Sequence, residues 1–434
     1  MGCKSNNATE RSSAVAPGLT DADPRRIAGR LLEQFPDGGI DPRLPGLVPG
    51  FDAPFFQAGL AGYSDAAMRI VARRHGCPLC VTEALLDRTV LAGGRGFAKA
   101  DLGELHHNVP GGVEDHPLAG QLMGSDPREM AAAAVKMIEQ ARRPDQHYRD
   151  LAHKGESFPK HGVQQSPSRQ RGVTPHSPDP APDPAFETID INLACPVKKI
   201  KARARGGHWL AQPDGAIAII EAVRDALPAS VPVTLKIRRG YDDSDEMAGN
   251  FERIVSAGFD IGLAWVTVHG RTVSQKYVGP SRWDVLRDIV SRHPDRLILG
   301  SGDVWSAADI FRMIDYTGVA AVSVARGCIG NPWIFRQARE ILAGREPAPP
   351  TLAEQRAVLE DHYALALAVN ATMKQADAFT GRTMRKFAIR FAQHHPQGDE
   401  VKRGFIEVSS QDEWRGVLDR WYGRSRARST SGQD

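Results

Sequence analysis

The sequence predicts an α/β protein, a TIM (β/α)8 barrel followed by a small all-helical domain. Three observations support this prediction. Short apolar runs rich in β-branched residues alternate with amphipathic stretches between residues 51 and 343, the pattern of a parallel sheet with crossover helices. The apolar runs number eight, which is the number of strands that closes such a barrel. From residue 350 the pattern becomes purely helical.

The predicted strands cover residues 53–58, 78–82, 117–122, 187–192, 231–237, 264–269, 296–300 and 320–325. Helical stretches separate them. Those that begin at Asp126 and Pro213 open with the acidic and proline residues that favour a first helical turn. A doubly wound sheet is the competing architecture, but no G-x-G-x-x-G fingerprint follows the first strand. We therefore favour the barrel.

We expect the barrel to occupy residues 46–345 and the helical domain to occupy residues 350–424. Residues 1–45 are predicted to be a mobile N-terminal extension, and residues 425–434 to be a basic tail. Residues 143–185 are rich in Pro, Ser, Gln and charge and poor in aliphatic side chains. Such a segment buries too little apolar surface to offset the entropy of ordering, so we predict a mobile, disordered insertion. It follows a helix and precedes a strand, which places it on the amino-terminal face of the barrel.

Composition indicates the cellular compartment and argues against a membrane protein and a metal site. The chain has 434 residues and a formal net charge of only +3. Its five scattered cysteines do not resemble a disulfide framework, which favours a reducing cytoplasm. There is no apolar run of ~20 residues and no signal peptide, so we expect a cytoplasmic protein without a membrane partner. We also expect the protein to be monomeric. Cys77 and Cys80 have no second ligand pair, so we expect no metal and place both in or near the core.

Residues 187–207 combine a strand, a thiol and a basic loop. Asn192 and Cys195 stand at the carboxyl end of the strand. Five cations follow the thiol: Lys198, Lys199, Lys201, Arg203 and Arg205. A thiol with an unperturbed pKa of ~8.5 is mostly protonated near neutrality, so it can donate a proton or act as a nucleophile. A buried structural cysteine is the alternative, although Pro196 makes a continued buried strand unfavourable. The pattern predicts acid chemistry on a phosphate-rich substrate.

Polar residues end six of the predicted strands, and carboxyl ends form the active face of a barrel. They are Gln121, Asn192 with Cys195, Lys236 with Arg238, His269 with Arg271, Gly300 to Asp303, and Arg326 with Gly327. The glycine-containing loops after the last two strands favour a phosphate site, with ordinary glycine turns as the alternative. Lys236 and His269 could stabilise the anion of a reduced ring system. A flavin mononucleotide (FMN) would satisfy these roles together.

From Phe51 to Arg424 the chain resembles the tRNA-dihydrouridine synthases, most closely their bacterial B-type branch. The stretches that carry the resemblance are residues 59–69 (GLAGYSDAAMR), 81–86, 120–127, 190–207, 232–240, 266–272, 301–304 and 325–335. The resemblance implies reduction of the C5–C6 double bond of specific uridines in tRNA, with FMN as cofactor and NADPH as reductant. It also implies that the hydride goes from FMN to C6 and that Cys195 gives a proton to C5.

The same resemblance implies a set of cofactor contacts. They are Gly59, Leu60, Ala61, Gln121, Asn192, Lys236, His269, Ser301, Gly302, Asp303, Ala325 and Arg326. The chain departs from the family pattern at several positions. Gly59 and Leu60 stand where Pro and Met are usual, and Phe387 stands where a motif of the helical domain has His.

The helical domain carries a group of cations at helical spacing, Arg382, Arg385, Lys386 and Arg390. We interpret them, with the basic loop after Cys195, as contacts to the phosphate backbone of tRNA, with a solvated charged face as the alternative. Two other functions remain open. An FMN barrel acting on a free pyrimidine would need neither basic region, and a flavin-containing protein that binds tRNA without turnover would not need Cys195. The sequence does not predict which uridine is modified.

Overall fold

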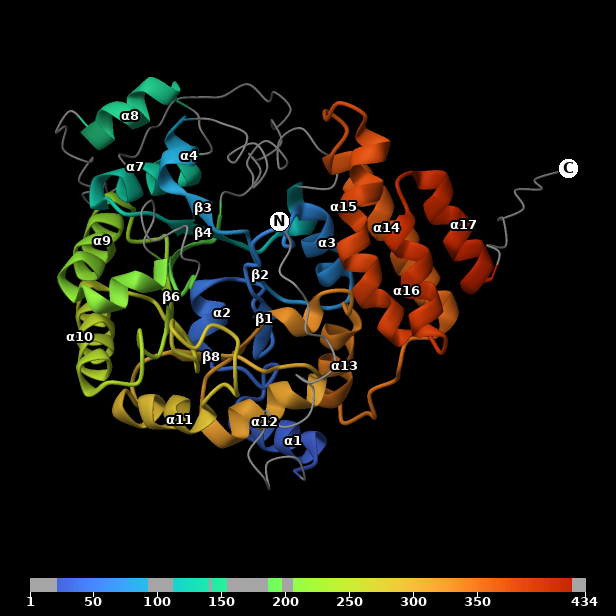
Figure 1. Cartoon of the computed structure of the whole chain (residues 1–434). Coiled ribbons are helices and arrows are strands. Elements are labelled where there is room, and N and C mark those ends of the chain that lie inside the picture. The colour runs from blue at the N-terminus through green and yellow to red at the C-terminus, as the bar shows by residue number, and fades with distance from the viewer. Residues whose placement is uncertain (1–21, 93–111, 140–142, 154–185, 197–205, 424–434) are drawn as a thin grey trace, which may run out of the picture.

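Eight parallel strands form a closed barrel in the computed structural model, which describes residues 22–92, 112–139, 143–153, 186–196 and 206–423 (Figure 1). The barrel strands are β1 (Phe55–Gln57), β2 (Cys80–Val81), β4 (Leu118–Met123), β5 (Thr188–Leu193), β6 (Val233–Arg238), β7 (Val266–His269), β8 (Ile298–Ser301) and β9 (Val322–Val324). Each pairs with the next, β1 pairs with β9, and β2 pairs directly with β4, which closes the ring. All eight predicted strands are confirmed, and one short addition, β3 (Leu85–Leu86), pairs with β4.

A layer of helices surrounds the strands (Figure 1). These helices are α3 (Ala66–Arg74), α4 (Asp87–Ala92), α7 (Pro127–Ile138), α9 (Pro213–Ala226), α10 (Asp245–Ile261), α11 (Trp283–Arg292), α12 (Ala307–Thr317) and α13 (Trp333–Leu342). Their starts follow local rules. Asp126 accepts hydrogen bonds from the first backbone N–H groups of α7, and Ser306 forms a capping box with Asp309 at α12. Every residue of β4 and β5 is buried, as expected when helices and the barrel interior cover both faces.

The N-terminal region differs from our prediction, because residues 22–45 are folded rather than mobile. Helix α1 (Pro24–Gln34) packs against α12 and α13, and its Ile27 and Ala28 are fully buried (Figure 1). Helix α2 (Arg43–Leu47) joins a second apolar cluster with residues from the starts of the strands. Proline and glycine content suggested mobility, but a few well-spaced apolar residues are enough to dock both helices.

The prediction that residues 143–185 are disordered is also partly wrong, because residues 145–153 form helix α8 (Asp145–His153). Helix α8 packs on α7 and α4 and buries Tyr148 and Leu151. The fully buried Lys136 of α7 fixes its start by donating hydrogen bonds to Asp145 Oδ1 (2.6 Å) and Val90 O (2.7 Å). Residues 154–185 lie outside the described residues, as do residues 1–21 and the predicted basic tail.

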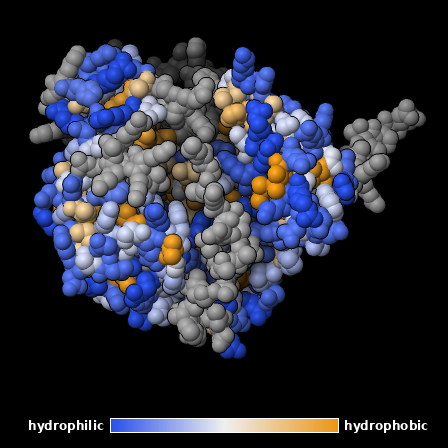
Figure 2. Space-filling model, viewed as in Figure 1, coloured by the Kyte–Doolittle hydropathy of each residue, from blue (hydrophilic) through white to orange (hydrophobic). Residues whose placement is uncertain are grey.

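Four helices form a separate group beside α3 (Figure 1). They are α14 (Leu352–Val369), α15 (Ala376–Phe391), α16 (Gly398–Glu407) and α17 (Gln411–Trp421). Helix α14 starts with a capping box at Thr351 and packs against α3 of the barrel. The face of this domain seen in Figure 2 is mostly hydrophilic, with some hydrophobic residues exposed among the hydrophilic ones. Within the described residues, none of the helices has the length and apolar composition needed to cross a membrane.

Candidate active site

A cavity of about 330 Å³ opens at the carboxyl ends of the barrel strands. Each of the eight barrel strands contributes to its lining, either from its own carboxyl end or from the loop that follows it. Every residue that we expected to contact the cofactor lines this cavity, and so does Cys195. Seven segments that are far apart in the sequence therefore meet in one place. Cysteines 77 and 80, by contrast, are buried in the core, as expected.

A chain of hydrogen bonds orders the side chains at the cavity floor. Asn192 Nδ2 donates to Gln121 Oε1 (2.7 Å), and Gln121 Nε2 donates to Asp190 Oδ2 (2.7 Å). Thr234 Oγ1 donates to the other oxygen of Asp190 (2.7 Å). Burial raises the pKa of Asp190, although both of these hydrogen bonds and nearby Lys236 favour the carboxylate. The chain ends at the thiol loop, where Ala194 N donates to Asn192 Oδ1 (2.9 Å).

Positive charge dominates the cavity. Burial, reinforced by neighbouring Arg238 and opposed by Asp190, lowers the pKa of Lys236 to about 8. Burial also depresses the pKa of His269 well below its usual value, and the surrounding cations Lys236, Arg238, Arg271 and Arg326 reinforce this effect. His269 is therefore a neutral imidazole at pH 7 within a ring of cations. Such a site favours an anionic ligand.

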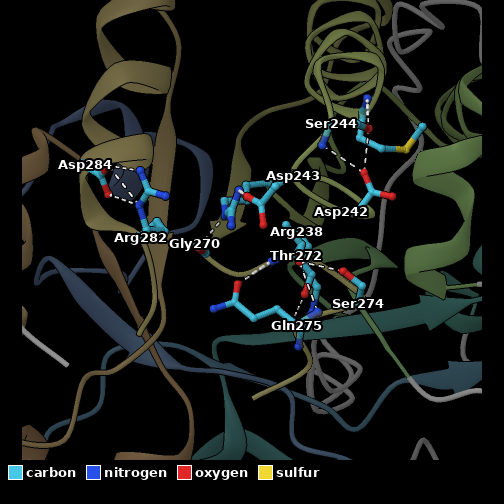
Figure 3. Close-up of polar contacts among 12 residues, drawn as sticks. Arg238, Asp242, Asp243, Ser244, Gly270, Thr272, Ser274, Gln275, Arg282 and Asp284 are labelled. Atoms are coloured by element: carbon cyan, nitrogen blue, oxygen red, sulfur yellow. Dashed lines mark hydrogen bonds and ion pairs between the residues drawn. The ribbon is translucent and has the colours of Figure 1, made fainter. Parts of the chain in front are cut away.

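Arg238 ties the thiol loop to the loop after β7. Its side chain is buried, Nε donates to Ala194 O (2.8 Å), and one terminal nitrogen donates to Thr272 O (2.7 Å) and Lys276 O (2.8 Å). Figure 3 shows Arg238 beside Thr272, whose Oγ1 accepts a hydrogen bond from Gln275 N (3.2 Å) within the same loop. Arg238 therefore holds the backbone next to Cys195, a role that its strand-end position alone did not reveal.

The loops after β8 and β9 form the corner that we predicted to bind phosphate. Gly302 has φ +115°, and a Cβ there would lie 2.7 Å from His269 Cδ2, so a side chain does not fit. Asp303 also has positive φ, and its Oδ2 accepts from Arg271 and from Ser281 N, both at 2.7 Å. The carboxylate of Asp303 is buried and hydrogen-bonded to the neighbouring loop after β7, so it holds the two loops together and does not meet an anion as an exposed charge. Arg326 lies 3.5 Å from the other Asp303 oxygen.

Two aromatic residues hold Arg326 at the cavity wall, and sequence reasoning did not identify them. The guanidinium carbon lies 4.8 Å from the ring centroid of Tyr277 and 4.7 Å from that of Trp305. Both rings line the cavity and are partly exposed. These two cation–π contacts limit the positions that the guanidinium can take. A signal was present, because each aromatic follows a strand-end motif, HGRT or SGDV, within a few residues.

The predicted RNA contacts divide into three groups. Lys198, Lys199, Lys201, Arg203 and Arg205 lie outside the described residues. Arg382 is exposed on α15, and Arg390 lines a second cavity of about 390 Å³ in the helical domain. Arg385 and Lys386 make contacts within the protein instead. Arg385 donates to Glu407 O (3.2 Å) and Val408 O at the end of α16, and Lys386 donates to Gly62 O in the barrel.

The fold and this site define a class, the (β/α)8 barrel proteins with a cation-lined cavity for an anionic ligand at the carboxyl face. The comparison with known families is more specific. A model of the dihydrouridine synthase (Dus) family matches residues 181–422, more than half of the chain. The chain belongs to this family.

Curated relatives agree with the family. The chain is 32% identical over 235 residues to a probable tRNA-dihydrouridine synthase of Mycobacterium leprae, covering 54% of this chain and 59% of that protein. It is 29% identical over 306 residues to tRNA-dihydrouridine synthase B of Shewanella oneidensis, covering 70% and 77%. With tRNA-dihydrouridine synthase B of Escherichia coli K12 it shares 26% identity over 371 residues, covering 84% and 94%. The match to the mycobacterial protein thus spans less than two thirds of that relative.

Proposed function

We propose that this protein is an FMN-dependent enzyme that reduces uridine in tRNA to dihydrouridine. One observation carries the proposal: the cavity brings a thiol, a lysine, a neutral histidine and an arginine together at the carboxyl face of the barrel. Membership of the dihydrouridine synthase family and the printed names of the relatives support the same conclusion.

The residues present fit FMN. The cavity is rich in cations, Gly302 leaves room where a Cβ would collide, and the buried Ser323 Oγ at the cavity has no hydrogen-bond partner among the described residues. Arg326 and the backbone at Ser301–Asp303 and Ala325 would hold the phosphate group. Gln121, Asn192, Lys236 and His269 would hold the ring, with the turn at Gly59–Ala61 against it. When bound, FMN would take electrons from NADPH and supply the hydride for C6 of uracil.

The side chains of this protein have distinct tasks in that reaction. Cys195 is partly exposed at the cavity, where its thiol would give a proton to C5 of uracil. Asn192 and Arg238 fix the backbone on which that thiol stands, through Ala194 N and Ala194 O. Lys236 places a positive charge beside the cofactor, where it would stabilise negative charge on the reduced ring.

The tRNA must present its target base outside the helical stack, because the thiol lies in a cavity. Arg382, exposed on α15, and the basic segment of residues 198–205 are the proposed contacts to the phosphate backbone. Arg385 is a weaker candidate than its sequence suggested, since its guanidinium is already bonded to the end of α16.

A spectrum of the purified protein tests the proposal. We expect flavin absorbance that bleaches on anaerobic addition of NADPH and returns faster with unmodified tRNA than with free uridine. Equal rates with free uridine would instead favour a free-pyrimidine enzyme. Cys195→Ala should abolish dihydrouridine formation while tRNA binding persists, and normal turnover in this variant would refute the acid role of Cys195. A protein that neither contains nor takes up FMN would contradict the proposed function.

A further inference from the structure

The turn of residues 59–63 forms one edge of the cavity and is poorly fixed by its own sequence. Gly59, Leu60 and Ala61 line the cavity, and Gly62 has φ +77°, a conformation that side chains disfavour. Two glycines in five residues make the ordering of such a turn costly in conformational entropy. Inside the turn, Leu60 N donates to Ser64 Oγ (2.7 Å) and Tyr63 N donates to Leu60 O (2.9 Å).

Gly62 has no side chain, so other parts of the protein can hold it only by its peptide groups. Its N–H donates to Glu83 Oε2 (2.9 Å), from the loop between β2 and β3. Its carbonyl accepts a hydrogen bond from Lys386 Nζ, which comes from α15 in the helical domain. A carboxylate and an ammonium thus hold the same residue from two sides, and charge-assisted bonds are the stronger kind.

Two aromatic rings also contact the ammonium group of Lys386. Lys386 Nζ lies 5.0 Å from the ring centroid of Tyr63 and 4.9 Å from that of Phe387. The two rings meet edge to face at 5.5 Å, one from the turn and one from α15. The cation therefore binds to the turn through a carbonyl and a ring at once. Phe387, where the family motif has His, supplies the second ring.

We propose that Lys386 is a positioning residue of the cofactor site, through which the helical domain fixes the turn of residues 59–63 at the cavity edge. The inference rests on the proposed function insofar as the ligand of that edge is FMN. It changes the assignment of Lys386, which the sequence suggested as an RNA contact. The helical domain then becomes part of the cofactor site, because without it the carbonyl of Gly62 loses its cationic partner.

The test compares Lys386→Met, which keeps the apolar stem but removes the charge, with Lys386→Arg and with Lys374→Met. Lys374 is an exposed lysine between α14 and α15, and it serves as the matched control. We would measure amide hydrogen exchange at residues 60–64 in the FMN-free protein and FMN affinity by quenching of flavin fluorescence. Exchange requires no cofactor, so it reports on the contact itself.

We expect Lys386→Met to speed exchange selectively at residues 60–64 and to weaken FMN binding about tenfold, the typical effect of losing a hydrogen bond to a charged group. Lys386→Arg should recover part of both properties, and Lys374→Met should change neither. Unchanged exchange and FMN affinity in Lys386→Met would overturn the proposal. Faster exchange throughout α3 and α14 would also overturn it, since Lys386 would then serve only to dock the domain. If the wild-type protein does not bind FMN, the proposed function fails, while the exchange result still decides whether Lys386 fixes the turn.

Discussion

The carboxylate of Asp190 determines how two amide side chains face the cavity. It accepts hydrogen bonds from both Gln121 Nε2 and Thr234 Oγ1, so the Gln121 oxygen must point to Asn192 Nδ2. In Asp190→Asn one of the two acceptors becomes a donor, and one buried donor loses its partner at a cost of about 1–3 kcal/mol. We expect FMN affinity to fall by roughly tenfold or more, as measured by flavin fluorescence. Thr234→Ser keeps the hydroxyl and is the control, and wild-type affinity in Asp190→Asn would show that the amides are oriented by other contacts.

We expect FMN binding to depend on pH through the side chain of Lys236. In the ligand-free protein its pKa is about 8, so the ammonium is mostly charged below pH 8 and mostly neutral above it. An anionic ligand binds the charged form more tightly, so we expect FMN affinity to be highest below pH 8 and to decline as pH rises through that value. Titrations of FMN between pH 6.5 and 9.5 measure this dependence. Lys236→Met should bind FMN more weakly and show a flatter profile, whereas an unchanged profile would assign the titration to another group.

The placement of residues that end a barrel strand could be predicted from the sequence, and contacts with distant parts of the chain could not. Cys195, Lys236 and His269 stand at strand ends, and the barrel rule alone brings them together. The roles of Arg238 and Lys386 depend on carbonyls 34 to 324 positions away along the chain. No periodicity or spacing encodes such partners.

Among the elements, helix α8 shows how a single buried charge can order a segment of polar composition. Lys136 is fully buried, while Asp145 at the start of α8 is partly exposed. In Asp145→Ala the buried ammonium loses its carboxylate partner, so we expect a loss of about 3 kcal/mol in the free energy of unfolding. The double variant Lys136→Met/Asp145→Ala removes that charge and should be more stable than Asp145→Ala alone. Urea unfolding measures both, and equal stabilities would mean that α8 is held by apolar packing.

The number of apolar residues in each element explains which elements could be predicted from the sequence. The eight strands were found because each is a short run rich in apolar residues, and every residue of β4 and β5 is buried, as the barrel architecture requires. Helices α1, α2 and α8 were missed because each buries only one to three side chains, such as Ile27, Leu44 and Tyr148, within segments whose overall composition suggested mobility. The average composition of a segment hides these few apolar side chains, but the packing of each helix on the barrel depends on them.

For the whole molecule, a buried histidine lies in α14, the helix of the helical domain that packs against α3 of the barrel, and we expect it to make the stability of the folded protein sensitive to acid. His362 of α14 lies 4.6 Å from the ring of Phe387, centroid to centroid, and neither of its ring nitrogens has a hydrogen-bond partner among the described residues. Burial lowers its pKa to about 4; Asp65 of the barrel and Asp361 oppose the shift, and Lys386 adds to it. The folded protein therefore keeps this imidazole neutral.

In the unfolded chain the same histidine has an ordinary pKa of about 6.5, so it binds a proton more readily than in the folded protein. Its contribution to stability is complete above pH 6.5 and is lost as pH falls towards 4, at about 1.4 kcal/mol per pH unit. We expect His362→Leu, which cannot titrate, to lose less stability than the wild type between pH 6.5 and 4.5. Urea unfolding at a series of pH values gives the difference between the two proteins, which cancels the contribution of the other titrating groups. Parallel curves would mean that the pKa of His362 is not lowered in the folded protein.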